Sequence, residues 1–336
     1  MKLHLDKNAF QVLLNNVHGR TGYRLDVLEK DYYVVLILKE LAELQRDGLP
    51  AYFKGGTALY KALKTTNRFS EDIDLSVDTR ECSRTQNNKR LEKATKNYTS
   101  LVRNAEEGKT NRSEVLAMYH YDPIVPYDED DALQRFGKLK VEATSFTISE
   151  PTEDLTIAAM LYDLATDEEK AILESNYEVA PFEIKTITIE RIFIDKLFAA
   201  EAYVRKSAET NRAFEAAKHI YDLSVMSNLP SIIRLCDDTE QMQYLLKIRL
   251  KEESERRDGI PGIAPKMFSF FTDVKNNAAV RKAYDIMQQQ YVLRDADRIP
   301  FEKALGSLIK IKALLERNPA WRTCTPIKKK DDREDR

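Results

Sequence analysis

The pattern of apolar positions in the first third of the chain predicts helices separated by short strands. Residues 25–44 carry apolar side chains on a wide face at helical spacing, which predicts a long helix. Residues 47–50 (DGLP) follow, and Gly and Pro there end the helix. A short apolar run then leads to Gly55-Gly56. Thr57-Ala58-Leu59 predicts the first turn of another helix, which ends near Leu63.

Two later segments alternate with the period of a β-strand. Asp72 and Asp74 alternate with three aliphatic residues, so a strand places both carboxylates on one face and the aliphatic side chains on the other. In the segment KLKVEATSF, Glu142 shares a face with Lys138 and Lys140. Both segments therefore predict strands with one polar and one apolar face.

The remainder of the pattern is less regular until residue 189. Residues 80–115 are charged and compatible with helix, and residues 119–135, rich in Asp and Pro, predict a loop. From about residue 189 onward the pattern is helical, with a break at 259–265. The charge run at 327–336 has no apolar anchor and is expected to be disordered.

Composition limits the class of protein. The 336 residues are 43% hydrophobic and 32% charged, as in ordinary globular proteins. No apolar run approaches the ~20 residues that span a bilayer, and MKLHLDKNAF lacks the apolar segment of a secretory signal. The three cysteines are widely spaced and odd in number. We therefore expect a protein of the cytoplasm with no membrane partner.

Charge is distributed unevenly along the chain. Residues 1–184 carry 24 basic and 32 acidic side chains, a net of −8, which leaves 29 and 23, a net of +6, for residues 185–336. The asymmetry suits an acidic, metal-binding domain at 1–184 with N-terminal helices, joined to a basic helical domain at 185–326 that meets a polyanion. Ordinary variation among solvated helical faces explains the same numbers equally well.

The two aspartates and a third carboxylate suggest a metal site. Asp72 and Asp74, with Glu142 from the second strand, offer the hard oxygen ligands that suit Mg²⁺. Two such ions support an in-line displacement at phosphorus. Backbone N–H groups at Gly55, Gly56 and Thr57, at a helix N-terminus, can approach phosphate oxygens closely. Together these are the parts of a nucleotidyl-transfer site.

Each part also has a purely structural interpretation. An Asp-x-Asp is often a solvated strand edge, a Gly pair can be a tight turn, and Glu142 can be a surface partner of a lysine. Arg68 and Ser70, just before the aspartates, either contact phosphate or close the loop. The order strand, Gly-Gly, helix and Asp-x-Asp strand is more specific than any of these elements alone.

The segments KGGTAL and RFSEDIDL resemble the signature of the AbiEii toxin family. EKDYYV upstream and KVE downstream resemble the same family, as do two later stretches, IERIFIDKLFAAEAYV and FEAAKHIYDLSVM. The resemblance covers about residues 25–226. It implies an α+β protein with a DNA polymerase β-like nucleotidyltransferase core, a small mixed sheet and a largely helical C-terminal domain.

The resemblance also implies two more site residues. In the family, a lysine and an aspartate on the two later helices complete the site, and they match Lys196 and Asp222. This chain has Lys218-His219 where the family often has Arg-Asp. From the residues alone, Lys196 is a lysine that extends along an apolar surface or one that binds a triphosphate, and Asp222 forms an intrahelical pair with Lys218. The resemblance instead implies that Asp222 orients Lys196 or the acceptor hydroxyl. A structural role is expected for His219.

The predicted function is Mg²⁺-dependent transfer of a nucleotidyl group from a nucleoside triphosphate to an acceptor hydroxyl. The resemblance implies a toxin of type IV toxin–antitoxin and phage-defence systems, with RNA as acceptor, expected to be the 3′ end of tRNA, and growth arrest as the outcome. It also implies a cognate antitoxin encoded nearby, which need not bind the toxin directly. The alternatives are transfer to a protein side chain (AMPylation) or to a small molecule such as an antibiotic, or a nucleotide-binding module without turnover.

Overall fold

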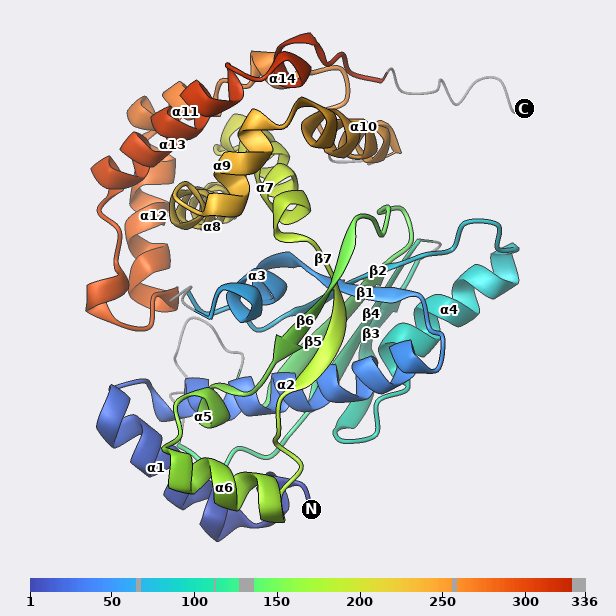
Figure 1. The fold of residues 1–336 in the computed structure, drawn as a ribbon, viewed down its shortest axis with the longest axis vertical. Helices are drawn as coiled ribbons and strands as arrows, with labels where there is room; N and C mark the ends of the chain where they lie inside the picture. The colour runs from blue at the N-terminus through green and yellow to red at the C-terminus, as the bar shows by residue number, and fades with distance from the viewer. Residues whose placement is uncertain (65–67, 112, 127–135, 256–258, 328–336) are drawn as a thin grey trace. The chain divides into compact units, whose positions relative to one another are not determined.

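A computed structural model describes residues 1–64, 68–111, 113–126, 136–255 and 259–327 (Figure 1). Unit 1 comprises Met1–Ile187 with Leu293–Ala296, and unit 2 comprises Thr188–Val292 with Asp297–Arg336. The expected α+β class is confirmed, because unit 1 contains a mixed sheet and the described part of unit 2 is largely helical.

Unit 1 is built on a mixed sheet with the strand order β3-β4-β5-β2-β1-β7-β6 (Figure 1). Its strands are β1 (Ala51–Lys54), β2 (Ile73–Val77), β3 (Val102–Thr110), β4 (Glu114–His120), β5 (Lys138–Thr144), β6 (Thr152–Ile157) and β7 (Phe182–Ile187). Strand β2 lies in the middle, antiparallel to β1 and parallel to β5. Strand β1 also pairs in parallel with β7.

The helices of unit 1 surround this sheet and connect its strands. They are η1 (Leu3–Leu5), α1 (Lys7–Thr21), α2 (Leu25–Arg46), α3 (Gly55–Leu63), α4 (Arg84–Lys96), α5 (Met160–Asp163) and α6 (Asp167–Asn176). At the end of α2, the buried amide of Gln45 donates to the carbonyls of Ala51 (2.6 Å) and Lys185 (3.0 Å) and accepts from the Lys185 N–H (2.8 Å). One side chain thereby fixes the helix to both β1 and β7.

The apolar faces of β2 and β5 form the core of the sheet. Ile73, Leu75 and Val77 are fully buried, and so are the aliphatic residues that face the same side on β5. Burial of each such side chain contributes about 1.5–3 kcal/mol. Because side chains alternate along a strand, this burial directs the acidic residues between them to the opposite face.

Residues 80–120 contain strands that the sequence pattern did not predict. Helix α4 lies within the segment that is compatible with helix, but β3 and β4 follow it. Nearly every side chain of β3 is exposed, so the strand shows no apolar alternation and depends on backbone pairing with β4. Strand β4 also extends to His120, which corrects the expected loop start at residue 119, and most of the remaining loop, 127–135, lies outside the described residues.

Unit 2 packs its helices around α7 and α8. They are α7 (Ile189–Arg205), α8 (Arg212–Met226), α9 (Pro230–Asp237), α10 (Thr239–Glu255), α11 (Phe270–Asp273), α12 (Ala278–Tyr291), α13 (Phe301–Leu315) and α14 (Pro319–Thr323), with short turns η2 (Pro265–Met267) and η3 (Val274–Asn276) between them. The turn η4 (Asp295–Asp297) begins in the unit 1 segment Leu293–Ala296 and ends in unit 2. Helices α7 and α8 pack on each other, and α12 and α13 pack on α8. The expected break at 259–265 lies between α10 and η2.

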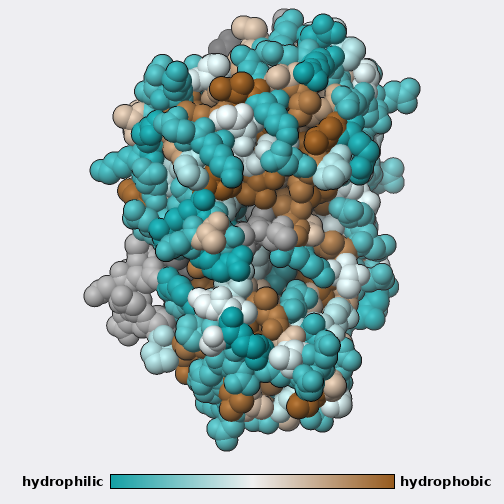
Figure 2. All heavy atoms as spheres, turned by 60° about the vertical axis from the view of Figure 1, so that its left-hand side comes forward, coloured by the Kyte–Doolittle hydropathy of each residue, from teal (hydrophilic) through white to brown (hydrophobic). Residues whose placement is uncertain are grey.

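The surface is mixed. Hydrophilic residues cover much of the face drawn in Figure 2, with hydrophobic residues between them. Across the described ranges, no helix is long and apolar enough to cross a membrane. The expected disordered tail at 327–336 lies, apart from Ile327, outside the described residues.

Candidate active site

The turn between β1 and α3 passes directly over the aspartate strand. Gly55 has φ +83°, a left-handed conformation that favours glycine, and a Cβ there would overlap Asp74 Oδ2. A Cβ on Gly56 would lie 2.7 Å from Ser70 Oγ and 3.0 Å from an Arg68 guanidinium nitrogen. The glycine pair therefore lets the backbone come within contact of the predicted site's own side chains.

Thr57 joins the start of α3 to the segment before β2. Its buried hydroxyl donates to the Asp72 carbonyl (2.5 Å) and lies 3.0 Å from Ser70 Oγ. Arg68 is buried on the same side, with a guanidinium N–H donating to the Phe69 carbonyl (3.4 Å). The loop-closing role expected for Arg68 and Ser70 is thus visible in these contacts, and a role in phosphate binding stays a prediction.

Strands β2 and β5 bring the predicted metal ligands together. Their parallel register pairs Asp74 with Glu142, and Asp72 lies two residues before Asp74 on the same face. On the other side of β2, Lys54 of β1 pairs with Asp74. Asp74 therefore has a residue of like charge, Glu142, as its neighbour on β5 and a residue of opposite charge, Lys54, as its neighbour on β1.

Burial and neighbouring like charges raise the pKa of Asp74. Burial raises it to about 6, with the carboxylates of Asp72 and Glu142 adding to the effect, while Lys54 and Lys140 oppose it. In the folded protein the charged form of Asp74 is thus less favourable than in water, although it still predominates at pH 7. A cation bound between these carboxylates would relieve that cost.

The carboxylates suit Mg²⁺ by ligand type, but an ammonium lies among them. Lys140 Nζ is 2.9 Å from Asp72 Oδ2 and 3.6 Å from Glu142 Oε2. Within the described residues, no three His, Cys, Asp or Glu side chains converge as a ready metal site. The oxygen donors Asp72, Asp74 and Glu142 remain the residues that could hold the ion, because they share one face of two paired strands and gather negative charge there.

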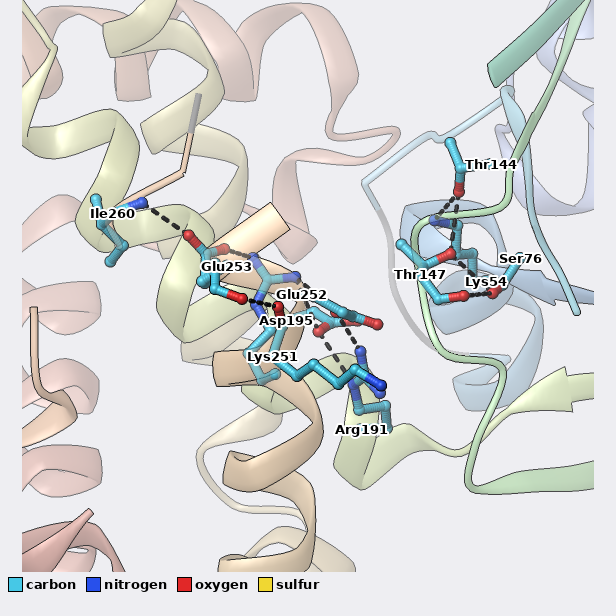
Figure 3. Close-up of polar contacts among 12 residues, drawn as sticks. Lys54, Ser76, Thr144, Thr147, Arg191, Asp195, Lys251, Glu252, Glu253 and Ile260 are labelled. Atoms are coloured by element: carbon cyan, nitrogen blue, oxygen red, sulfur yellow. Dashed lines mark hydrogen bonds and ion pairs between the residues drawn. The ribbon is translucent and has the colours of Figure 1, made fainter. Parts of the chain in front are cut away.

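Lys54 and a group of hydroxyls beside it also border the predicted site, although the sequence motifs did not indicate them. Lys54 Nζ donates to Thr144 Oγ1 (3.0 Å), as Figure 3 shows. Thr144 lies 3.0 Å from Thr147 Oγ1, which donates to Ser76 Oγ (2.8 Å). The sequence contained one indication of this role for Lys54: the lysine lies immediately before the glycine pair, where the strand ends at the predicted phosphate-binding turn.

Two buried ion pairs on α2 were also missed. Lys30 pairs with Glu71, the residue between Ser70 and Asp72, and both side chains are at most 5% exposed. The next residue of α2, Asp31, accepts a hydrogen bond from Lys61 Nζ of α3 (2.5 Å). The charged triplet EKD in an otherwise apolar helix was the visible signal, because charges rarely occupy a buried face without a partner.

Unit 2 joins the two residues that the resemblance implied. Lys196 Nζ of α7 donates to Asp222 Oδ2 of α8 (2.5 Å), and the side chains are only 6% and 2% exposed. Lys218 pairs with Glu215 (2.7 Å). The structure therefore brings Lys196 and Asp222 into contact, and the role of Asp222 in orienting Lys196 or the acceptor hydroxyl stays a prediction. The ring of His219 stacks on that of Tyr203.

A second set of charges fixes the first turns of α7. Arg191 donates to Asp195 (3.1 Å) and to Glu252 of α10 (2.6 Å), and Figure 3 shows this network. Arg249 contacts the same two acids and also pairs with Glu253. Because Asp195 precedes Lys196, the network holds the helical turn from which Lys196 extends.

A protein-family model described as the nucleotidyl transferase AbiEii toxin of type IV toxin–antitoxin systems matches residues 36–315. The chain belongs to the AbiEii family. It is therefore a member of a family of nucleotidyltransferase toxins, as the motifs predicted.

Solved structures similar to this AbiEii protein include MenT4, a nucleotidyltransferase toxin from Mycobacterium tuberculosis, at 16% identity and a TM-score of 0.48 over 89% of this chain and 98% of that chain. JHP933 from Helicobacter pylori is similar at 17% identity and a TM-score of 0.44, over 88% of this chain and 94% of that chain. No curated protein sequence matches.

The contact between Gly55 and Asp74 predicts the effect of Gly55→Ala. The new methyl group must turn the Asp74 carboxylate away, so nucleotidyl transfer should fall at least about tenfold, while the left-handed φ costs about 1 kcal/mol of folding free energy. Gly48→Ala is the matched control, since Gly48 has φ +87° and nothing lies within 4 Å of the position that its new methyl group would take. Urea unfolding and transfer assays on both variants test this, and equal activity would contradict it.

The raised pKa of Asp74 predicts that Asp74→Asn stabilises the metal-free protein. Asp74 has a folded pKa of about 6 against an ordinary value of 3.8, so its charge costs stability increasingly as pH rises from about 4 to 6, and fully above that. We expect Asp74→Asn to gain about 1–2 kcal/mol at pH 7 in EDTA, with the gain vanishing near pH 4. Asp154→Asn, which alters an exposed pair with Lys185, should change little. A pH-independent gain would rule out this origin.

Proposed function

We propose that this AbiEii protein transfers a nucleotidyl group from a nucleoside triphosphate to an RNA hydroxyl, and that its acceptor is the 3′ end of tRNA. The observation that carries the proposal is the parallel register of β2 and β5, which places Asp74 beside Glu142 at the strand that Gly55 contacts. Acidic ligands and a backbone turn for phosphates are thereby next to each other. This is the minimum that nucleotidyl transfer needs.

The reaction requires one bond to form and one to break at the α-phosphorus. The acceptor hydroxyl loses its proton to solvent water as its oxygen bonds to the α-phosphorus, the bond to the oxygen bridging to the β-phosphorus breaks, and pyrophosphate leaves with that electron pair. Mg²⁺ held by Asp72, Asp74 and Glu142 would supply charge neutralisation for the phosphates and activation of the hydroxyl. The N–H groups of Gly55, Gly56 and Thr57 would orient the triphosphate, because the first N–H groups of a helix have no carbonyl partner within it.

Lys196 is proposed to bind the triphosphate while its hydrogen bond to Asp222 fixes the orientation of its side chain. An ammonium that is 6% exposed loses hydration, which Asp222 compensates in the free protein. Holding the lysine by a carboxylate reduces the side-chain entropy that it would otherwise lose on binding phosphate. Asp222 would thus act through Lys196.

The charge distribution supports a polyanionic acceptor. Residues 185–336 carry a net +6, and phosphate contacts are the sequence-independent part of RNA binding. Toxin activity with growth arrest would follow from blocking the acceptor end of tRNA. Membership of a type IV system also supports a cognate antitoxin encoded nearby, with no requirement that it bind the toxin directly.

Paired substitution of Lys196 and Asp222 separates stability from triphosphate binding. Lys196→Met alone removes the ammonium that Lys196 contributes to the buried Asp222 carboxylate and should lose about 3–5 kcal/mol of folding free energy. The double variant Lys196→Met/Asp222→Leu should recover most of that loss because an apolar pair replaces a buried ionic one. Transfer activity should remain abolished in the double variant. A double variant with restored activity would remove Lys196 from the reaction.

The dependence of RNA affinity on salt tests the acceptor. Each phosphate neutralised by a basic side chain should contribute about −0.7 to −0.9 to the slope of log K against log salt. Lys206→Gln/Arg212→Gln should reduce that slope by one to two, since Arg212 lies on α8 and Lys206 directly follows α7. Arg205 is left intact because it pairs with the fully buried Glu201. Neutralising Lys328, Lys329 and Lys330 is the control and should change little, because acidic residues follow them.

The accompanying assay is incubation with each labelled triphosphate and total RNA, followed by a denaturing gel. Label in the tRNA band of the wild type, and none with Asp72→Ala, is the expected result. A flat salt dependence with label in protein or small-molecule fractions would contradict the RNA acceptor and favour AMPylation or antibiotic modification.

A further inference from the structure

Lys140 has an unusual place at the candidate site. It projects from the same face of β5 as Glu142, two residues earlier, and its ammonium lies 2.9 Å from Asp72 and 3.6 Å from Glu142. The ammonium thus lies between Asp72 and Glu142, two of the three proposed metal ligands. A divalent cation at the same position would neutralise both carboxylates. A positive charge therefore already lies where the proposed chemistry needs a metal ion.

We propose that Lys140 is an exchangeable counter-cation of the acidic site: it compensates the carboxylates in the metal-free protein, gives way to the divalent cation, and then contacts the triphosphate. This inference rests on the proposed function, because it assigns a role to one residue of the same site. Two opposed consequences follow. Lys140 competes with the metal for the carboxylates, and it adds attraction for the nucleotide.

The exposure of the three side chains allows such an exchange. Lys140 is 30% exposed, Asp72 35% and Glu142 27%, so solvent reaches all members of the cluster. A partly exposed ion pair is weak and the lysine side chain is flexible, so a doubly charged ion can replace the ammonium at small cost. The buried pairs Lys30–Glu71 and Lys61–Asp31, with exposures of 1–5%, lack this access.

Once the metal ion holds the carboxylates, a displaced ammonium would have the incoming triphosphate as a further anion at the site. Asp74, the strand neighbour of Glu142, contacts the Gly55 turn that is proposed to hold phosphates. A lysine leaving Asp72 therefore remains beside the nucleotide. Its charge would compensate the phosphate oxygens that the metal does not neutralise.

Lys138 supplies a matched control on the same strand. It shares a face of β5 with Lys140, but its ammonium pairs with Glu107 of β3 (2.9 Å). Lys138→Met removes the same charge from the same strand without touching the acidic cluster. General effects on net charge or strand stability should appear equally in both variants.

The experiment measures binding of Mn²⁺, as a spectroscopic probe for Mg²⁺, and of an α,β-methylene analogue of each nucleoside triphosphate. Lys140→Met should bind Mn²⁺ at least about threefold more tightly than wild type without nucleotide, because no ammonium must be displaced. With saturating Mn²⁺ it should bind the analogue at least about threefold more weakly. Its melting temperature in EDTA should fall, and added Mn²⁺ should raise it by more than in wild type. Lys138→Met should match wild type in both affinities.

The opposite signs of the two effects distinguish this role from a structural one. If Lys140→Met binds Mn²⁺ equally or more weakly while wild type binds it, Lys140 does not compete with the metal and the inference is wrong. If wild type and both variants bind no Mn²⁺, the proposed metal site itself fails. Lys140→Gln, which keeps most of the side-chain length, must show the same two opposite changes, and this variant decides the outcome if Lys140→Met does not fold.

Discussion

The parallel pairing of β2 with β5 is the constraint on which the candidate site depends. The aliphatic residues of both strands face the core, so their acidic residues must face the other side, and the register then sets Asp74 beside Glu142. Burial raises the pKa of Asp74, and repulsion from the neighbouring carboxylates of Asp72 and Glu142 adds to that effect. The groups around these carboxylates either compensate their negative charge or lie where a bound ligand could interact with it. Lys54 and Lys140 counteract that negative charge. The turn at Gly55 lies so close to Asp74 that a ligand bound at the turn would lie beside the same carboxylates.

The buried charges of α2 keep these elements in register. Lys30 holds Glu71, which is adjacent to Asp72 in the chain, and Asp31 holds both Lys61 of α3 and the N–H of Met160 (2.6 Å). Breaking such a pair costs several kcal/mol because one charge stays buried alone. The loop before β2 is thus attached on one side to Thr57 and on the other to Lys30. These contacts hold the segment before the predicted metal ligands from two sides, in addition to the backbone pairing of β2.

Unit 2 uses the same physical principle on helices. The pair of Lys196 with Asp222 joins α7 to α8 within an apolar core, and the network of Arg191, Arg249 and their acidic partners joins α7 to α10. In each case a buried cation has a carboxylate within hydrogen-bonding distance. Charges that could serve a phosphate ligand are thereby kept ordered in the protein before any ligand binds.

The sequence by itself determined the elements with a strong apolar period and the residues that those elements carry. Helix α2 and strands β2 and β5 were predictable because burial of apolar side chains gives each element a characteristic spacing of apolar residues. The candidate ligands Asp72, Asp74 and Glu142 followed because they occupy the polar positions between the apolar ones. Motif order predicted the family. Strands β3 and β6 were not predictable because their mostly exposed side chains leave no apolar alternation along the strand. Only the tertiary structure decided the register that sets Asp74 against Glu142, the partner of each buried charge, and the place of Lys140 among the carboxylates, because these depend on which strands and helices meet in space and not on the spacing of residues along any one of them.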